Sequence, residues 1–134
     1  MMNKNTFKTV TLNKGELNIY DCGTIKFLAY KTNDFIDDEV FIVEKDGRAV
    51  IIESPCFFDN IKELTEYLNS LKVDGMLVAY HGAGAAFLPN VPKYATQNAA
   101  DYSENGGVCP KEIAKKAICL DTDIAKALGD LITE

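Results

Sequence analysis

The sequence contains one histidine in 134 residues, and this scarcity excludes several kinds of site. A metal centre built on two or three imidazoles of one chain cannot form, and neither can a proton relay between histidines. The four cysteines are far apart and form no Cys-x-x-Cys pair, which excludes a zinc ribbon and a thioredoxin-type motif. We therefore expect neither a resident metal nor a cofactor.

Long apolar runs are also missing. No stretch approaches the roughly 20 apolar residues that a membrane span needs, and residues 1–7 carry one lysine, Lys4, without the apolar run of a secretory signal. Nothing in the cysteine spacing indicates a disulfide framework. We expect a protein of the reduced cytoplasm that makes no contact with a membrane.

The charge balance excludes a further class of partner. Lys and Arg number 14 against 20 Asp and Glu, which gives a net charge of -6. A surplus of negative charge opposes non-specific attraction to nucleic-acid phosphates, so we expect no nucleic acid partner. With 47% hydrophobic and 25% charged residues, the composition predicts one globular domain over residues 1–134.

The first half of the chain shows the alternation of half-buried strands. Short apolar and polar alternations cut by turns predict an antiparallel meander over residues 8–30. The apolar runs 40–43 and 49–52 flank Asp46-Gly47, which is a strong hairpin signal. Both of these runs are apolar on both faces, which predicts that they are covered on both sides.

A change of periodicity after Pro55 predicts a helix. Its apolar stripe runs from Ile61 to Leu71, Asp59 or Asn60 can cap it, and Val73-Asp74-Gly75 ends it. The apolar run 76–80 then predicts a buried strand parallel to the preceding one, in a right-handed βαβ unit.

The remaining segments read as a loop followed by helices. We expect a loop over 81–92, a short helix within 95–102 and helices starting near Pro110 and Asp121, the last one packed on the sheet. The fold class is thus α/β (α+β), with a mixed β-sheet and helices mainly on one face.

Two reactive side chains follow neighbouring strands of the βαβ unit. Cys56 and His81 should emerge at the same carboxyl edge of the sheet, where open α/β sheets place ligands. There Cys56 could act as a nucleophile and His81 as its base, with the Gly82 and Gly84 region supplying backbone amides. The alternative is that Cys56, which precedes two phenylalanines, is simply packed.

The same edge is the predicted place for a small ligand. Its contacts would come from His81, Gly82, Gly84 and Tyr94, although ordinary packing would also account for the tyrosine.

The order of these elements resembles the amino-terminal half of the metallo-β-lactamase superfamily. The residues that carry the resemblance are the hairpin ending in Glu53-Ser54-Pro55, the His81-Gly82 loop after the next strand, and the segment Pro92-Lys93-Tyr94-Ala95. The resemblance covers residues 7 to 102 and implies half of an αββα sandwich.

The family's metal loop is degenerate in this chain. His81 occupies the first ligand position, but alanine stands at the other three, namely Ala83, Ala85 and Ala86. Alanine cannot donate an electron pair to a metal, so the resemblance implies a non-catalytic relative, a pseudoenzyme without the family's metal. The alternatives are an enzyme using Cys56 and His81, or a metal-dependent hydrolase with an atypical site, including one shared between subunits.

A half sandwich leaves the apolar face of its sheet without a covering layer. Exposed apolar surface of that size is normally covered by a partner. We therefore expect a homodimer formed by sheet packing and a role in protein interaction or small-ligand binding.

Overall fold

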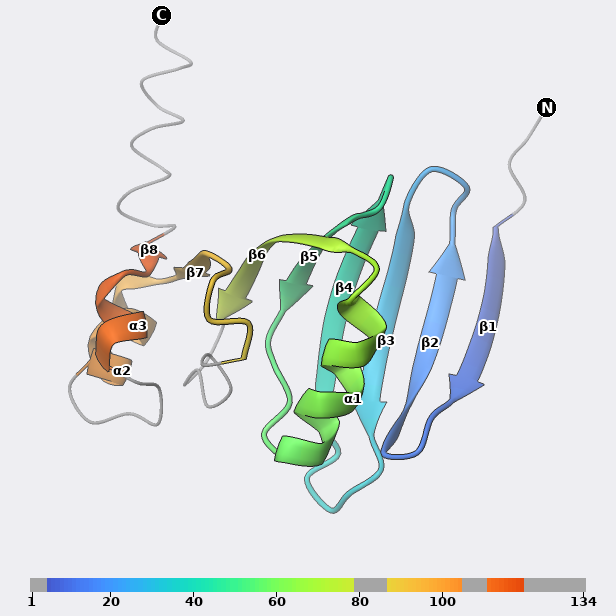
Figure 1. The fold of residues 1–134 in the computed structure, drawn as a ribbon, viewed down its shortest axis with the longest axis horizontal. Helices are drawn as coiled ribbons and strands as arrows, with labels where there is room; N and C mark the ends of the chain where they lie inside the picture. Colours follow the sequence, from blue (N-terminus) through green and yellow to red (C-terminus); the bar gives the residue numbers. More distant parts are fainter. Residues whose placement is uncertain (1–4, 79–86, 105–110, 120–134) are drawn as a thin grey trace, which may run out of the picture.

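A computed structural model describes residues 5–78, 87–104 and 111–119. The described residues form one sheet of eight strands that stand side by side in chain order (Figure 1). The strands are β1 Thr6–Thr11, β2 Gly15–Asp21, β3 Lys26–Thr32, β4 Glu39–Lys45, β5 Arg48–Ile52, β6 Lys72–Val78, β7 Lys93–Ala95 and β8 Ile118–Cys119. The helices are α1 Phe58–Leu68, α2 Gln97–Glu104 and α3 Lys111–Lys115.

The first five strands are antiparallel, so the predicted meander is confirmed. The hairpin between β4 and β5 turns at Asp46 and Gly47, whose φ angles are 51° and 77°. Two consecutive positive φ angles are typical of the tight type I′ turn that closes such hairpins. The predicted Asp-Gly hairpin is therefore also confirmed.

The second part of the sheet is parallel. β5 and β6 run parallel with α1 between them in the chain, which confirms the predicted βαβ unit. β7 and β8 continue the sheet in the same direction. The mixed α/β architecture expected from the sequence is thus observed.

The predicted cap of α1 is wrong. The residue before the first helical turn is Phe57, which makes no side-chain cap hydrogen bond. Asn60 is instead buried under the helix, where its Nδ2 donates to the Lys14 carbonyl at 2.8 Å and to the Tyr30 hydroxyl at 3.1 Å. Its amide is thus used to hold the helix on the sheet.

Strand β6 begins earlier than the sequence indicates. Val73-Asp74-Gly75 was predicted to end the helix, but these residues belong to β6. The strand shifts register opposite Ala49 and Val50, and Asp74 pairs with Arg48 of β5 through a 2.7 Å contact. A bulge therefore accommodates turn-forming residues inside a strand.

The carboxyl-terminal elements agree with the sequence only in part. β7 and β8 were not predicted, and α2 begins two residues after the expected start of that helix. α3 lies within the helical segment expected after Pro110. The helix predicted from Asp121 lies outside the described residues.

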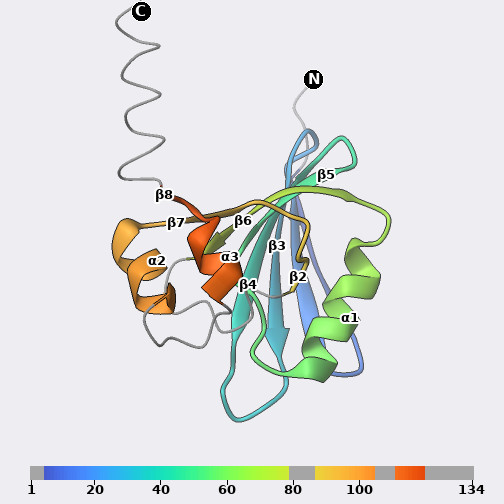
Figure 2. The ribbon, with the colours of Figure 1, turned by 60° about the vertical axis from the view of Figure 1, so that its left-hand side comes forward.

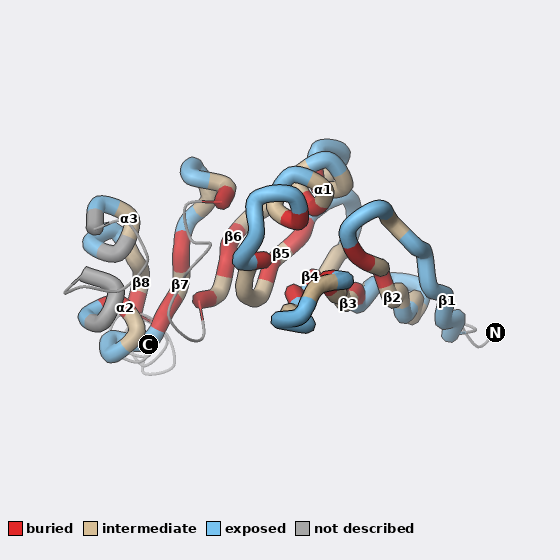
Figure 3. Tube along the Cα trace, turned by 90° about the horizontal axis from the view of Figure 1, so that it is seen from below, coloured by how far each residue is buried: buried red, intermediate tan, exposed pale blue. Residues whose placement is uncertain are grey.

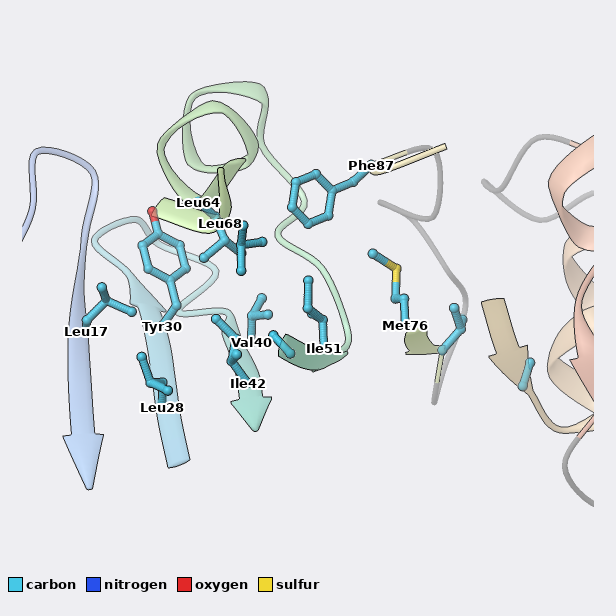
Figure 4. Packing of buried hydrophobic residues seen from close by; sticks show 13 residues of the cluster. Leu17, Leu28, Tyr30, Val40, Ile42, Ile51, Leu64, Leu68, Met76 and Phe87 are labelled. Atoms are coloured by element: carbon cyan, nitrogen blue, oxygen red, sulfur yellow. The ribbon is translucent and has the colours of Figure 1, made fainter. Parts of the chain in front are cut away.

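The core lies between one face of the sheet and α1, which crosses that face (Figures 1 and 2). Leu64 and Leu68 of α1 pack on strand residues such as Ile42 and Ile51, and Phe87 joins them near Met76 (Figure 4). Burial of this apolar surface is the main force that holds the helix to the sheet.

No described helix covers the opposite face of the sheet. Within the part of the chain that the structure describes, α1 lies on one side of the sheet, and α2 and α3 lie together at the β7–β8 edge (Figures 1 and 3). On the open side Phe41 of β4 is 43% exposed. The expectation that runs 40–43 and 49–52 are covered on both sides is therefore wrong for the described residues. None of the described helices is long and apolar enough to cross a membrane.

Candidate functional site

The carboxyl edge of β5 and β6 is where the sequence predicts a reactive pair. The parallel pairing of these strands places the segment after β5, which contains Cys56, at that edge. The predicted contacts His81, Gly82 and Gly84 lie outside the described residues. The pairing of Cys56 with His81 and the small-ligand site beside it therefore stay predictions.

The described surroundings of Cys56 are acidic. The residue is exposed, and its backbone N–H donates to Asp38 Oδ2 at 3.1 Å. Partial desolvation, followed by the neighbouring carboxylates with Asp38 first among them, raises the pKa of the Cys56 thiol to about 11. A reactive thiolate needs cationic surroundings that lower its pKa. These contacts keep the thiol protonated at neutral pH.

Tyr94 lies on β7 and faces the open side of the sheet. It pairs with Leu77 of β6, and Leu77 pairs in turn with Ile52 of β5. Its ring lies over Gly75, where a Cβ atom would fall 2.7 Å from Tyr94 Cε2. The absent side chain of Gly75 therefore makes room for the tyrosine ring on this surface.

We call the side of the sheet opposite α1 the open face. Directly opposed residues of neighbouring strands share a face of a sheet, so the register shows which side chains lie together here. One row across the strands consists of Phe7, Tyr20, Phe27, Val43 and Val50. The row beside it contains Ala29, Phe41, Ile52 and Leu77 on β3 to β6, and it ends in the polar pair Asn18 and Thr9 on β2 and β1.

These two rows make a broad apolar surface. With strands about 4.8 Å apart, five strands span on the order of 20 Å. Its aromatic side chains are well exposed, as Phe7 at 65% and Phe27 at 47% illustrate. Scattered exposed apolar residues are ordinary, but a contiguous apolar patch of this extent marks an interaction site.

Charged side chains lie at both ends of the open face. At one end, Glu16, Lys31 and Glu39 pair across β2, β3 and β4. At the other end, Lys45 of β4 pairs with Arg48 of β5. The apolar rows are therefore bordered by a mainly acidic row and by a pair of basic residues, of which Arg48 is bonded to Asp74 and Lys45 keeps its charge toward the open face.

The sequence showed the apolar character of this surface but not its extent. In the sequence, only the continuous apolar runs 40–43 and 49–52 indicate strands with a second apolar face. They predict that another layer covers each side of the sheet. The contribution of Phe7, Tyr20 and Phe27 depends on the register of three strands, which the sequence does not display.

The residues of this chain do not reproduce the metal ligands of the family's loop. Among the described residues, no three His, Cys, Asp or Glu side chains are grouped so that they could hold a metal ion. Three of the four positions aligned with the family's ligands are alanine, which has no donor atom. The side chains at those positions do not fit a metal, and the expectation of a metal-free protein stays a prediction.

No protein-family model matches the sequence. No curated protein matches it either. The fold is similar to two solved structures of the DIM-1 metallo-β-lactamase, the second of them exposed to ceftazidime. The first likeness has a TM-score of 0.47 and 12% identity and covers 73% of this chain and 46% of the other. The second has a TM-score of 0.46 and 14% identity, with 71% and 45% covered. The chain thus spans less than half of either lactamase chain, and no activity follows from the likeness.

Proposed function

We propose that this protein is a non-catalytic interaction module whose open face is covered by a second copy of the chain. The observation that carries the proposal is the pair of apolar rows across the open face. Sheets with one apolar face normally bury it against another layer, and two such faces pack about 10 Å apart. A second copy supplies an apolar layer of identical size.

The charged ends of the open face favour a particular symmetry. A two-fold axis that lies between the sheets and runs across the strands reverses the strand direction of the partner. Glu39 at one end of β4 then faces Lys45 at the other end of the partner's β4, and Phe41 faces Val43. Each copy offers its acidic row to the basic residues of the other, so the face is electrostatically complementary to itself.

Two features support the absence of catalysis. The loop that resembles the family's metal loop retains His81 but has alanine at the other ligand positions. The thiol of Cys56, the other candidate nucleophile, has a pKa raised by desolvation and by nearby carboxylates. The alanines offer a metal no donor atom, and the described surroundings of Cys56 are not those of an activated thiolate.

Light scattering coupled to size exclusion tests the dimer. We expect the wild-type protein to be a dimer at micromolar concentration, and Phe41→Asp to be a monomer because it puts a charge into the apolar face. Phe58→Asp is the matched control: Phe58 is an exposed phenylalanine at the start of α1, outside the open face. This control should remain a dimer.

A charge exchange tests the symmetry. Glu39→Lys and Lys45→Glu should each weaken the dimer, and the double exchange should restore it. A monomeric wild-type protein would overturn the proposal, as would a Phe41→Asp variant that stays dimeric. Elemental analysis of protein purified without added metal tests the proposed absence of catalysis. Near-stoichiometric zinc, iron or manganese would contradict a non-catalytic role.

A further inference from the structure

Two neighbouring loops each carry a pair of exposed apolar residues at one end of the sheet. Phe35 and Ile36 belong to the loop between β3 and β4, and Phe57 and Phe58 stand at the junction of the β5–α1 loop with the helix. The rings of Phe35 and Phe57 lie with their centroids 5.9 Å apart. We call these four residues the aromatic tip.

The aromatic tip is strongly exposed. Phe35 is 89% exposed and Phe58 is 75% exposed, which are the two largest values among the exposed large hydrophobic residues of the described chain. Exposed aromatic side chains that lie next to one another on loops are typical of a contact surface. Core packing does not account for these residues.

The loop that carries Phe35 is held in one shape. Asp34 Oδ1 accepts hydrogen bonds from the backbone N–H groups of Ile36 at 2.9 Å and Asp37 at 3.1 Å. Asp38 Oδ2 accepts the N–H of Cys56, which ties this loop to the segment before α1. Because these bonds fix the two loops together, the tip is presented without a large entropy cost of ordering on binding.

Carboxylates surround the apolar tip. Asp37 flanks it on one loop, Glu39 begins β4 just after that loop, and Asp59 follows Phe58 on the helix. Lys31 contacts Asp37 at 3.1 Å and Lys14 contacts Asp59 at 3.9 Å, and all four of these side chains are well exposed. Exposed pairs of this kind are weak and open to exchange with another cation.

A cavity lies beside the tip. It has a volume of about 350 Å³, and its walls include Asn33, Asp34, Phe57 and Asp59. Lys14 also lines it, with Nζ 3.9 Å from Asp59 Oδ2, so an incoming cationic side chain has to replace this exposed ion pair. Aromatic, amide and carboxylate groups together suit the long apolar stem and cationic head of a lysine or arginine side chain.

We propose that the aromatic tip is a docking site for a basic amphipathic segment of another protein. The apolar face of that segment would cover Phe35, Ile36 and Phe58, and one of its cationic side chains would enter the cavity beside Phe57. The negative rim selects a cationic partner and repels nucleic-acid phosphates and anionic lipid headgroups. This site does not depend on the dimer proposed for the open face.

Titration with a synthetic peptide tests the proposal. The probe is an amphipathic helix of leucine and lysine, with about 18 residues or five turns, labelled for fluorescence anisotropy. We expect it to bind the wild-type protein, and to bind the double variant Phe35→Ser/Phe58→Ser about tenfold more weakly, because truncated apolar anchors carry most of the energy of an interface. The variant Asp37→Asn/Asp59→Asn should weaken binding less and should reduce its dependence on salt.

Three controls separate the tip from other causes. Phe7→Ser removes a phenylalanine of the open face that is 65% exposed and should leave peptide binding unchanged. A peptide with glutamate in place of lysine should not bind, and neither should vesicles of phosphatidylserine. Equal binding of the Phe35→Ser/Phe58→Ser variant would overturn the proposal, as would binding of the acidic peptide or of the vesicles.

Discussion

Tyr94 of β7 covers Gly75 of β6 so closely that any side chain at position 75 would meet its ring. A Cβ atom built on Gly75 would lie 2.7 Å from Tyr94 Cε2 and 3.2 Å from Cδ2. The glycine is therefore required by a neighbouring side chain and not by its own backbone angles, because its φ is outside the left-handed region that favours glycine. The contact joins the short strand β7 to the sheet and extends the apolar surface of the open face.

Gly75→Ala should destabilise the protein through this contact. The new methyl group forces the Tyr94 ring out of its position, and such overpacking costs about 1–3 kcal/mol. The loss is measured as the free energy of unfolding in urea. The double variant Gly75→Ala/Tyr94→Ala should lose less than the sum of the two single changes, since the clash disappears with the ring. Strictly additive losses would show that the two residues do not constrain each other.

The strand order up to β6 could be predicted because its signals are local. Alternation, the Asp46-Gly47 turn and the stripe of α1 are each readable within about ten residues. The start of β6 was missed because Val73-Asp74-Gly75 has turn-forming composition. Two distant partners, Arg48 and Tyr94, hold it in an extended strand.

The candidate surfaces show the same division between local and distant information. The presence of an uncovered apolar face followed from the half-sandwich expectation, but its rows depend on cross-strand register. Of the aromatic tip, the sequence shows only the two phenylalanines that follow Cys56. Its contact with Phe35, which is distant in the chain, is fixed by the hydrogen bond from Cys56 to Asp38.

Tyr30 links α1 to the sheet through a buried polar network. Its hydroxyl donates to Glu63 Oε1 at 2.8 Å and accepts from Asn60 Nδ2 at 3.1 Å, and the Glu63 carboxylate also accepts the Lys14 N–H. Removing the hydroxyl takes one hydrogen-bond partner from Asn60 and one from the Glu63 carboxylate, although both keep Lys14, and this costs about 1–3 kcal/mol. We expect Tyr30→Phe to lose that much stability at neutral pH.

The same network makes stability depend on alkaline pH. Burial raises the pKa of Tyr30 to about 12 from the ordinary 10.0, so the folded protein keeps this proton where the unfolded chain loses it. The stabilisation is complete below pH 10.0 and is lost as the pH rises through about 12. Wild-type stability should therefore fall more steeply over this range than that of Tyr30→Phe. Parallel curves would contradict the raised pKa.

Tyr67 should add a similar decline. Its pKa is also raised to about 12, by burial first and then by Glu44, whose Oε2 accepts the Tyr67 hydroxyl at 3.4 Å. Denaturant unfolding of Tyr67→Phe at the same pH values separates the loss of unfolding free energy caused by Tyr67 from the loss caused by Tyr30.

Alkylation of Cys56 distinguishes an exposed but unreactive thiol from a catalytic one. Desolvation and the neighbouring carboxylates raise the pKa of the thiol to about 11, so its reaction with iodoacetamide should be slow at neutral pH and should accelerate up to that value. Mass spectrometry of the peptide that contains Cys56 measures the rate apart from the other cysteines. Asp38→Asn removes a charge and a hydrogen-bonding carboxylate, and should move the profile to lower pH. Rapid alkylation of the wild-type thiol at neutral pH would instead indicate a cation near Cys56, and would favour the nucleophile and base pair of Cys56 and His81 over an interaction module.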